Sequence, residues 1–348
     1  MRAQHIKITL LTICMMATPV SASEAPLFQS DQMLNVVLTA PLSQAYSERK
    51  KEDRLWMQGQ FAYKTSDGTT YRTPVSVRTR GVFRRLNCKL PPLRLNFKKK
   101  QVAGTLFEGQ DKLKLVAPCA TDKQSQQDIV LEYLAYKSLE ILTNDALKSR
   151  LMRVSYVDSD GKRKPWTHIG FVIEDDKNMA RRMGMEVVTA PHINRSQLDV
   201  KKTALVELFQ LMIGNTDYST IRSPAGKDCC HNIELMKAES ASSKITPIPY
   251  DFDSAGIVNA KYAKPPDHLP ISNVRRRYFT GRCRTPEIWA ANFALFNGKR
   301  TEIVSLFANS PHLDERNKKS SVDYMNAFFD MLSDKKKRDR QVIGKCRE

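Results

Sequence analysis

Residues 213–254 read IGNTDYSTIRSPAGKDCCHNIELMKAESASSKITPIPYDFDS. This stretch holds three polar clusters, at 214–217, 231–232 and 250–253, separated by short apolar runs. A helix-like apolar run leads into the first cluster, and strand-like runs separate the others. Because loops at the ends of such elements commonly carry binding and catalytic side chains, the pattern predicts that the three clusters meet in one cleft.

The chain before this stretch alternates between apolar and polar residues. Alternation over 55–64, 69–80, 93–97 and 112–116 predicts strands, and Asp67-Gly68 supplies a hairpin turn between the first two. Apolar residues at helical spacing predict a helix over 128–142, with Thr121 or Asp122 as its cap. Two further strands are expected at 151–157 and 169–173, followed by a short charged helix over 178–185. Residues 23–52 are expected to form an arm with a first helix or strand.

The later chain is richer in helix-like patterns. A buried helix over 198–213 is expected to end at Gly214, and helices are expected at 288–296, 302–307 and 322–332. A sheet-rich first half and a helix-rich second half predict an α+β fold with two lobes, 23–174 and 175–348. A cleft between lobes is a frequent ligand site.

The N-terminus has the pattern of a cleavable signal peptide. Arg2, His5 and Lys7 precede an apolar run over 8–20, and small residues lead to Ala22, where cleavage is expected. The run is too short to span a membrane as a helix, and no later window is long and apolar enough. The sequence therefore predicts export, to a periplasm or beyond the cell, and no transmembrane segment.

The chain is strongly basic, with 56 Lys and Arg against 37 Asp and Glu. This balance favours anionic partners in general. No nucleic-acid recognition module or alternation of basic and aromatic residues is present, so specific nucleic-acid binding is not expected. The Lys and Arg run at 335–338 is interpreted as part of a solvated tail.

Six cysteines follow the expected cleavage point. An even number in an oxidising compartment predicts disulfides, although six cysteines allow fifteen pairings. Because Cys229 and Cys230 are adjacent, they are expected to bond to different partners rather than to each other. A zinc site is the alternative, but it lacks a C-x-x-C pair and has only His231 nearby.

The residue types in the three clusters suit metal-dependent phosphate chemistry. Such chemistry needs carboxylate and amide oxygens for a cation, a positive side chain on the phosphates, and a group that orients the attacking hydroxyl. Asp217 is the candidate orienting base, and Asn232 and Asp251 are the candidate metal ligands. Lys114, or its neighbour Lys112, is the candidate phosphate-binding cation, held by Glu132 from the helix that follows.

Each of these residues also has a simpler interpretation. Residues 214–217 can be a helix C-cap and turn, and the acidic residues after 249 can be a plain turn. Glu132 can be an ordinary helix acid, and His231 a structural hydrogen-bonding residue. The basic turn at 78–85 can cover phosphates or form a charged hairpin tip. The arginines at 275–277, with Arg282 and Arg284, can bind an acidic group or form a solvated face. No G-x-S-x-G, H-E-x-x-H or Walker motif is present.

At these residues the chain resembles the CotH-like family of secreted, atypical protein kinases, in a bacterial branch of exported proteins. The resemblance covers about residues 75–285. It implies a kinase-like fold with a sheet-rich N-terminal lobe and a mostly helical C-terminal lobe, and ATP-dependent phosphoryl transfer to protein hydroxyls with Mg²⁺ or Mn²⁺.

The same resemblance implies roles for single residues. Asp217 matches the catalytic aspartate, Asn232 the metal-binding asparagine, and Asp251 the aspartate of a D-F-G-like motif in which Asp253 replaces the glycine. Lys114 and Glu132 match the nucleotide lysine and its partner, with Lys89 or Lys112 as other candidates for the lysine. A second hypothesis is a catalytically inactive envelope protein that binds anionic partners.

Overall fold

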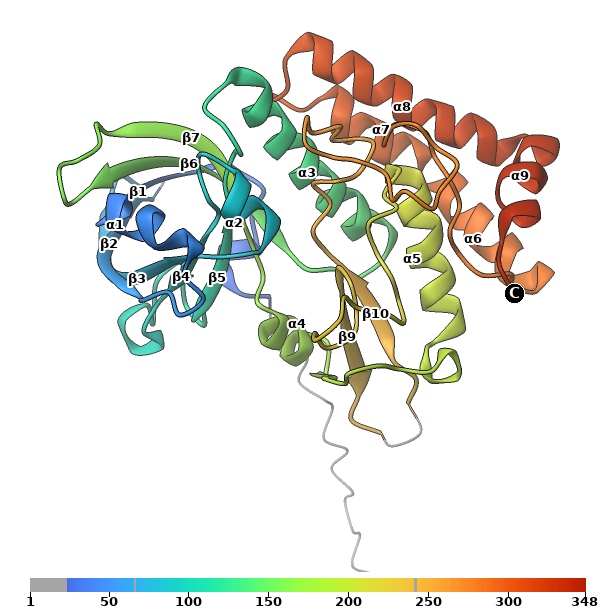
Figure 1. Ribbon diagram of the computed structural model, residues 1–348, viewed down its shortest axis with the longest axis horizontal. Helices are drawn as coiled ribbons and strands as arrows, with labels where there is room; N and C mark the ends of the chain where they lie inside the picture. Colours follow the sequence, from blue (N-terminus) through green and yellow to red (C-terminus); the bar gives the residue numbers. More distant parts are fainter. Residues whose placement is uncertain (1–23, 66, 241–242) are drawn as a thin grey trace, which may run out of the picture.

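A closed barrel of seven strands forms the first half of the protein (Figure 1). The computed structural model describes residues 24–65, 67–240 and 243–348. The strands follow one another around the barrel in the order β1-β2-β3-β4-β5-β7-β6. Their bounds are β1 Leu34–Ala40, β2 Met57–Lys64, β3 Thr70–Thr79, β4 Leu93–Asn96, β5 Lys112–Val116, β6 Ser149–Asp158 and β7 Trp166–Ile173.

The barrel closes through β1, which pairs with β2 on one side and with β6 on the other. The β1–β2 pairing is antiparallel, but the β1–β6 pairing is parallel, with Leu34 opposite Met152 and Ala40 opposite Asp158. Gly170 in β7 allows the close approach of β5, because a Cβ there would lie 2.7 Å from the Val116 carbonyl oxygen. Alternating side chains from all seven strands fill the interior.

The predicted two-lobed, kinase-like fold is wrong. The strands at 57–64, 70–79, 93–96 and 112–116 form as expected, but they do not remain an open sheet that serves as one lobe. The segment that was expected to be an arm with a first helix or strand supplies β1, and its parallel pairing with β6 closes the sheet into a barrel. Alternation shows which face of a strand is buried, but it does not show whether the first and last strands meet.

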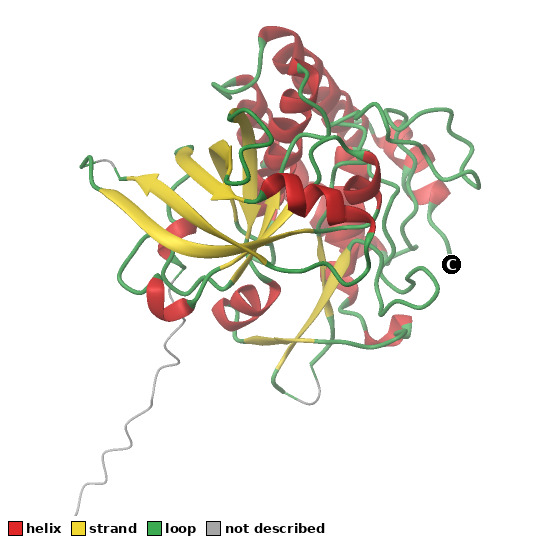
Figure 2. Cartoon of the chain, turned by 60° about the vertical axis from the view of Figure 1, so that its left-hand side comes forward, coloured by secondary structure: helices red, strands yellow, loops and turns green. Residues whose placement is uncertain are grey.

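The second half combines helices with a separate three-stranded sheet, so it is not a mostly helical unit either. Figure 2 shows this small sheet, in the order β10-β9-β8, apart from the barrel strands. Its strands are β8 Met185–Val187, β9 Ile233–Ala238 and β10 Thr246–Pro249. The longer helices are α3 Lys123–Leu142, α5 Val200–Ile213, α6 Pro286–Gly298, α7 Arg300–Ala308 and α8 Glu315–Ser333. The shorter helices are α1 Leu42–Ser47, α2 Phe83–Asn87, α4 Asp176–Arg182 and α9 Lys335–Gln341.

Helix α3 joins the two halves. It is capped by Asp122, whose side chain accepts a hydrogen bond from the Ser125 amide, as the sequence suggested. Thirteen of its 20 residues are buried, and it packs on β6 and β7 of the barrel and on α7. Its apolar residues share one core cluster with α5, α6 and α8, while the barrel interior forms a second cluster. The expected boundary at 174–175 falls between β7 and α4, but α3 crosses into the core of the later helices (Figure 1).

Three disulfides link the six cysteines that follow the expected cleavage point: Cys88–Cys119, Cys229–Cys230 and Cys283–Cys346. The prediction of disulfides is confirmed, and such bonds fit an exported protein. The prediction that Cys229 and Cys230 bond to different partners is wrong, because they bond to each other. The expected signal peptide lies outside the described residues. In the part of the chain that the structure describes, no helix is long and apolar enough to cross a membrane.

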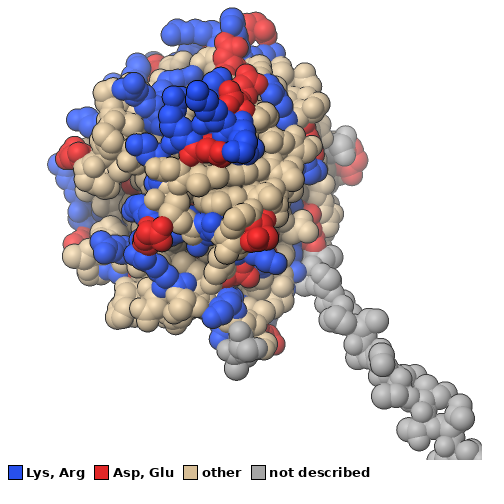
Figure 3. Space-filling view, turned by 90° about the vertical axis from the view of Figure 1, so that its right-hand side faces the viewer, with Lys and Arg blue, Asp and Glu red and all other residues tan. Residues whose placement is uncertain are grey.

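Basic side chains are prominent on one face of the molecule. Figure 3 shows the face on the right of Figure 1, where Lys and Arg side chains gather in the upper part. The run at 335–338 that was expected to be a tail instead begins α9, whose first turn is capped by the Asp334 side chain. Two of its lysines form surface ion pairs, Lys335 with Asp339 and Lys337 with Asp334.

Candidate active site

The three polar clusters of the 213–254 stretch meet in one cavity at the edge of the barrel. The cavity has a volume of about 570 Å³ and lies between the segment that follows β3 and the loops that follow α5 and β10. Four carboxylates and four cationic side chains line it: Asp217, Asp228, Asp251 and Asp253 with Arg80, Arg84, Lys227 and Lys264. His231, Asn232, Tyr250 and Tyr262 complete its polar wall.

Asp217 is positioned by the end of α5 and by two neighbours from the second cluster. The helix ends at Gly214 in the left-handed conformation (φ 70°), and the Asn215 side chain accepts a hydrogen bond from the Asp217 amide at 2.9 Å. The Asp217 carboxylate then contacts His231 Nε2 at 2.7 Å through Oδ1 and Asn232 Nδ2 at 3.2 Å through Oδ2. Fourteen intervening residues therefore do not prevent Asn232 from lying beside Asp217.

Asp251 follows β10 and presents an unpaired carboxylate to the cavity. Its amide donates a hydrogen bond of 2.8 Å to the Tyr136 hydroxyl from α3, which fixes the backbone at this point. Among the described residues, no hydrogen bond or ion pair engages its side chain. Asp251 (φ 61°) and Asn232 (φ 54°) both adopt left-handed backbone conformations. Such conformations are uncommon outside glycine and cluster at functional sites.

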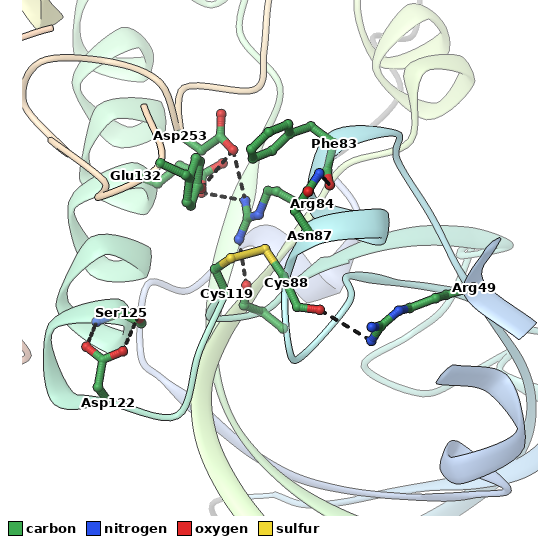
Figure 4. The surroundings of a disulfide bond; sticks show 12 residues. Arg49, Phe83, Arg84, Asn87, Cys88, Cys119, Asp122, Ser125, Glu132 and Asp253 are labelled. Atoms are coloured by element: carbon green, nitrogen blue, oxygen red, sulfur yellow. Dashed lines mark hydrogen bonds and ion pairs between the residues drawn. A yellow bond between two sulfur atoms is a disulfide. The ribbon is translucent and has the colours of Figure 1, made fainter. Parts of the chain in front are cut away.

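A buried ion-pair cluster forms the floor beside Asp251. Figure 4 shows Arg84 from α2 pointing at Glu132 of α3 and at Asp253, beside the Cys88–Cys119 disulfide. Arg84 Nη1 lies 3.1 Å from Glu132 and 3.8 Å from Asp253, while Nη2 donates to the Ala117 carbonyl. Asp253 also accepts a hydrogen bond of 2.9 Å from the Tyr262 hydroxyl. The disulfide holds the end of α2 against the segment before α3, and so helps to fix Arg84.

Burial and neighbouring charge shift the pKa values of this cluster. Burial raises the pKa of Glu132 to about 8, although Arg84 opposes that shift. Burial, reinforced by the Asp251 carboxylate, raises the pKa of Asp253 to about 6. The hydrogen bond that His231 makes to the Asp217 carboxylate raises the pKa of His231 above its usual value. Burial alone would lower the pKa of Arg84, but Tyr262, Glu132 and Asp253 raise it, so this side chain stays positively charged.

The donor set fits a hard divalent cation only when the ligand supplies further oxygens. Within the described residues, no group of three or more His, Cys, Asp or Glu side chains could hold a metal ion by itself. The Asn232 amide nitrogen donates to the Asp217 carbonyl and carboxylate, so its Oδ1 is the atom left to accept a cation. That oxygen and the unpaired Asp251 carboxylate suit Mg²⁺, which commonly takes one or two protein ligands and completes its shell with phosphates and water.

Of the predicted site residues, the structure brings together Asp217, Asn232 and Asp251, but it does not pair Lys114 with Glu132. Lys114 is buried against Asp176 and Glu234, at 2.9 and 3.5 Å, and its ammonium lies 4.8 Å from the centre of the Tyr250 ring. Lys112 is exposed at the start of β5, and neither lysine is among the described residues that line the cavity. Glu132 is buried behind the cavity wall, where its partner is Arg84, which does line the cavity.

Arg84 is the residue of the candidate site that the sequence patterns do not single out. It lies inside the basic turn at 78–85, for which the sequence leaves open a phosphate cover or a charged hairpin tip. Its nearness to Cys88 was the one available signal, because a disulfide there could anchor the turn against the rest of the fold. The pattern alone does not distinguish Arg84 from the half-buried Arg78 and Arg80 or from Arg85, which is also buried.

Comparison with known proteins adds no further assignment, since no protein-family model and no curated protein matches the chain.

Proposed function

We propose that the protein is an exported enzyme that transfers the terminal phosphoryl group of a nucleoside triphosphate, expected to be ATP, to a hydroxyl of a protein. The observation that supports this proposal is the composition of the cavity. The Asp251 carboxylate and the Asn232 amide oxygen, both suited to a cation, line the same cavity as the buried guanidinium of Arg84 and the basic side chains of Arg80, Lys227 and Lys264. Mixed charge of this kind matches a phosphate chain that carries a divalent cation.

In this proposal Asp217 orients the acceptor hydroxyl and takes its proton. The hydroxyl oxygen bonds to the terminal phosphorus as the bond from that phosphorus to the bridging oxygen breaks. The nucleoside diphosphate then leaves. His231 holds the Asp217 carboxylate in place through its 2.7 Å hydrogen bond. Asn232 and Asp251 would hold Mg²⁺ or Mn²⁺, which supplies neutralisation of the phosphate charge when bound. Arg84 replaces Lys114 as the cation expected to face the phosphates.

A competing function is that of a non-catalytic protein that binds anionic partners in the envelope. The observation in its favour is that both Asp217 carboxylate oxygens already accept hydrogen bonds, from His231 and Asn232. For transfer, one of these contacts has to give way to the acceptor hydroxyl. In a non-catalytic binding protein both hydrogen bonds to the Asp217 carboxylate would persist when the partner binds.

Thermal unfolding with nucleotide and metal tests the proposed function. ATP and Mg²⁺ at about 100 times the dissociation constant should stabilise the protein by about 2.7 kcal/mol, or roughly 5 °C in Tm. Asp251→Ala should abolish the metal-dependent part of the shift, because it removes the unpaired carboxylate. Asp217→Ala should retain the shift but lose phosphoryl transfer to a protein acceptor, measured with radiolabelled ATP.

Asp160→Ala is the matched control, since Asp160 is an exposed carboxylate in the turn between β6 and β7. This variant should change neither the thermal shift with nucleotide and metal nor phosphoryl transfer. The absence of a shift with every nucleotide and divalent metal would contradict the proposed enzyme. Nucleotide binding without transfer to any acceptor would favour the non-catalytic function.

A further inference from the structure

A second cavity lies on the other side of the chain segment that carries Asp217. Its volume is about 500 Å³. Thr216 and Tyr218, the two neighbours of Asp217, line this second cavity, while Asp217 itself lines the first. Arg222 lines the second cavity and Ser223 the first, so residues 216–223 form a shared wall.

Arginine dominates the charge of this second cavity. Five arginines line it, Arg195, Arg222, Arg282, Arg284 and Arg347, against two glutamates. Glu207 is buried and paired with Arg284 at 2.8 Å. In the described part of the chain, the other four arginines have no ion pair with a carboxylate side chain, and the guanidinium of Arg222 makes no hydrogen bond. The arginines of the cavity therefore exceed its glutamates. Three of the four guanidinium groups without an ion pair donate to main-chain oxygens, and that of Arg222 is left without a partner in the described structure.

One disulfide brings three of these arginines together. Arg282 and Arg284 flank Cys283, and Arg347 follows its partner Cys346. Two backbone hydrogen bonds reinforce the crossing: the Cys283 amide donates to the Arg347 carbonyl, and the Arg347 amide donates to the Gly281 carbonyl, each at 3.0 Å. The disulfide and the two backbone hydrogen bonds thus hold these positively charged residues close together despite their mutual repulsion.

Several guanidinium groups are already directed at acceptors. Arg195 and Arg282 both donate to the main-chain oxygen of Glu348, and Arg284 Nε is buried with no hydrogen-bond partner in the described structure. Burial, followed by the neighbouring Arg195 and Arg347, lowers the pKa of Arg282. A bound anion would relieve the repulsion among these side chains.

We propose that this arginine cavity, Arg195, Arg222, Arg282, Arg284 and Arg347, binds an acidic segment of the protein that receives the phosphoryl group. The guanidinium fork matches a carboxylate in bidentate geometry, and arginine is the preferred residue for such recognition. Apolar side chains also line the cavity, among them Leu198 and Leu269, and a bound peptide can pack against them. A peptide held there lies one chain segment away from Asp217, so a hydroxyl-bearing residue further along it can reach the first cavity. The role as an acceptor site rests on the proposed function, but the binding itself does not.

Fluorescence anisotropy with a labelled peptide of alternating Glu and Gly tests the inference. The wild-type protein should bind the peptide at low ionic strength and lose affinity as salt is added, because exposed charges are screened. The double variant Arg195→Glu/Arg222→Glu should bind about tenfold more weakly or worse. Both residues are exposed, so the fold should tolerate the change.

The matched control is Arg72→Glu, which reverses one exposed arginine on barrel strand β3. It should retain wild-type affinity, and a general charge effect would instead weaken both proteins in proportion to the charge removed. Equal binding by wild type and the double variant would overturn the proposal. So would stabilisation by inorganic phosphate alone with no peptide binding, since that result identifies a site for small oxyanions.

The peptide measurement separates this inference from the proposed enzyme. Asp251→Ala should leave peptide affinity unchanged while it abolishes the metal-dependent part of the thermal shift with nucleotide. If wild-type protein binds the peptide but never nucleotide, the proposed enzyme fails and the acidic-peptide site stands. If it binds nucleotide but not the peptide, the acidic-peptide site fails and the proposed enzyme stands.

Discussion

At the scale of single residues, Asp217 depends on His231 for its position. The hydrogen bond between them raises the pKa of His231 above about 6.5, its usual value, and that stabilisation is present below this pH. It is lost as the pH rises through the raised pKa, because neutral imidazole gains less from the carboxylate. NMR titration of the His231 ring should give a pKa above 6.5 in wild type. In Asp217→Asn the pKa should fall toward 6.5, and an unchanged value would show that the contact does not form in solution.

Arg84 and Glu132 should respond unequally to substitution, although their side chains are in direct contact. Arg84→Met leaves Glu132, Asp253 and the Ala117 carbonyl without their shared donor, and should cost about 3 kcal/mol of unfolding free energy. Glu132→Gln should cost about 1 kcal/mol or less near pH 7. The Glu132 carboxyl has a pKa raised to about 8 and is therefore largely protonated near pH 7. In this variant Arg84 also keeps its contact with Asp253 and its hydrogen bond to the Ala117 carbonyl. Denaturant unfolding measures both values, and equal losses would contradict this account.

The pH dependence of stability follows from the same raised pKa. Since the folded state holds the Glu132 proton more tightly than the unfolded state, the free energy of unfolding should fall as pH rises from about 4.5 to about 8. Glu132→Gln should remove this contribution and flatten the profile. A wild-type profile that rises through this range, with no difference in the variant, would show that Glu132 stays ionised.

At the scale of elements, the end of α5 decides where Asp217 lies. A Cβ at Gly214 would meet the Tyr324 hydroxyl oxygen at 2.0 Å, and the residue has a left-handed backbone. Gly214→Ala should therefore cost about 2–4 kcal/mol, from backbone strain together with overpacking. Gly161→Ala is the matched control, because Gly161 has a φ of +68° but nothing within 4 Å of its Cβ position. It should cost only about 1 kcal/mol. Similar melting temperatures for the two variants would show that Tyr324 moves aside freely.

At the scale of the whole molecule, α3 makes the two halves interdependent. It is buried between barrel strands β6 and β7 and helix α7, so residues 24–174 alone would expose its second apolar face. We expect this fragment to aggregate or to lack fixed tertiary structure, as judged by size-exclusion chromatography and near-UV circular dichroism. The full chain should unfold in one calorimetric transition. A monomeric fragment with its own cooperative transition would instead support two independent units.

The sequence determined most of the local structure and the residues of the candidate site. Alternation located β2 to β5, and helical spacing located α3 and α5. Gly214 ends α5 as predicted, and Asp122, one of the two predicted caps, begins α3. These features are set by short-range physics, namely which face is buried and which backbone angles a residue allows. The same patterns pointed to Asp217, Asn232 and Asp251, and these three residues line one cavity in the structure.

Only the tertiary structure decided how distant segments pair. It closed the barrel through β1 and β6, bonded Cys229 to Cys230, and gave Glu132 an arginine from 48 residues away in place of Lys114. An open sheet and a closed barrel have the same local sequence pattern. The local pattern is also compatible with several different cationic partners for one buried carboxylate. The choice among them depends on which packing buries the apolar faces of the whole chain with the fewest unpaired charges.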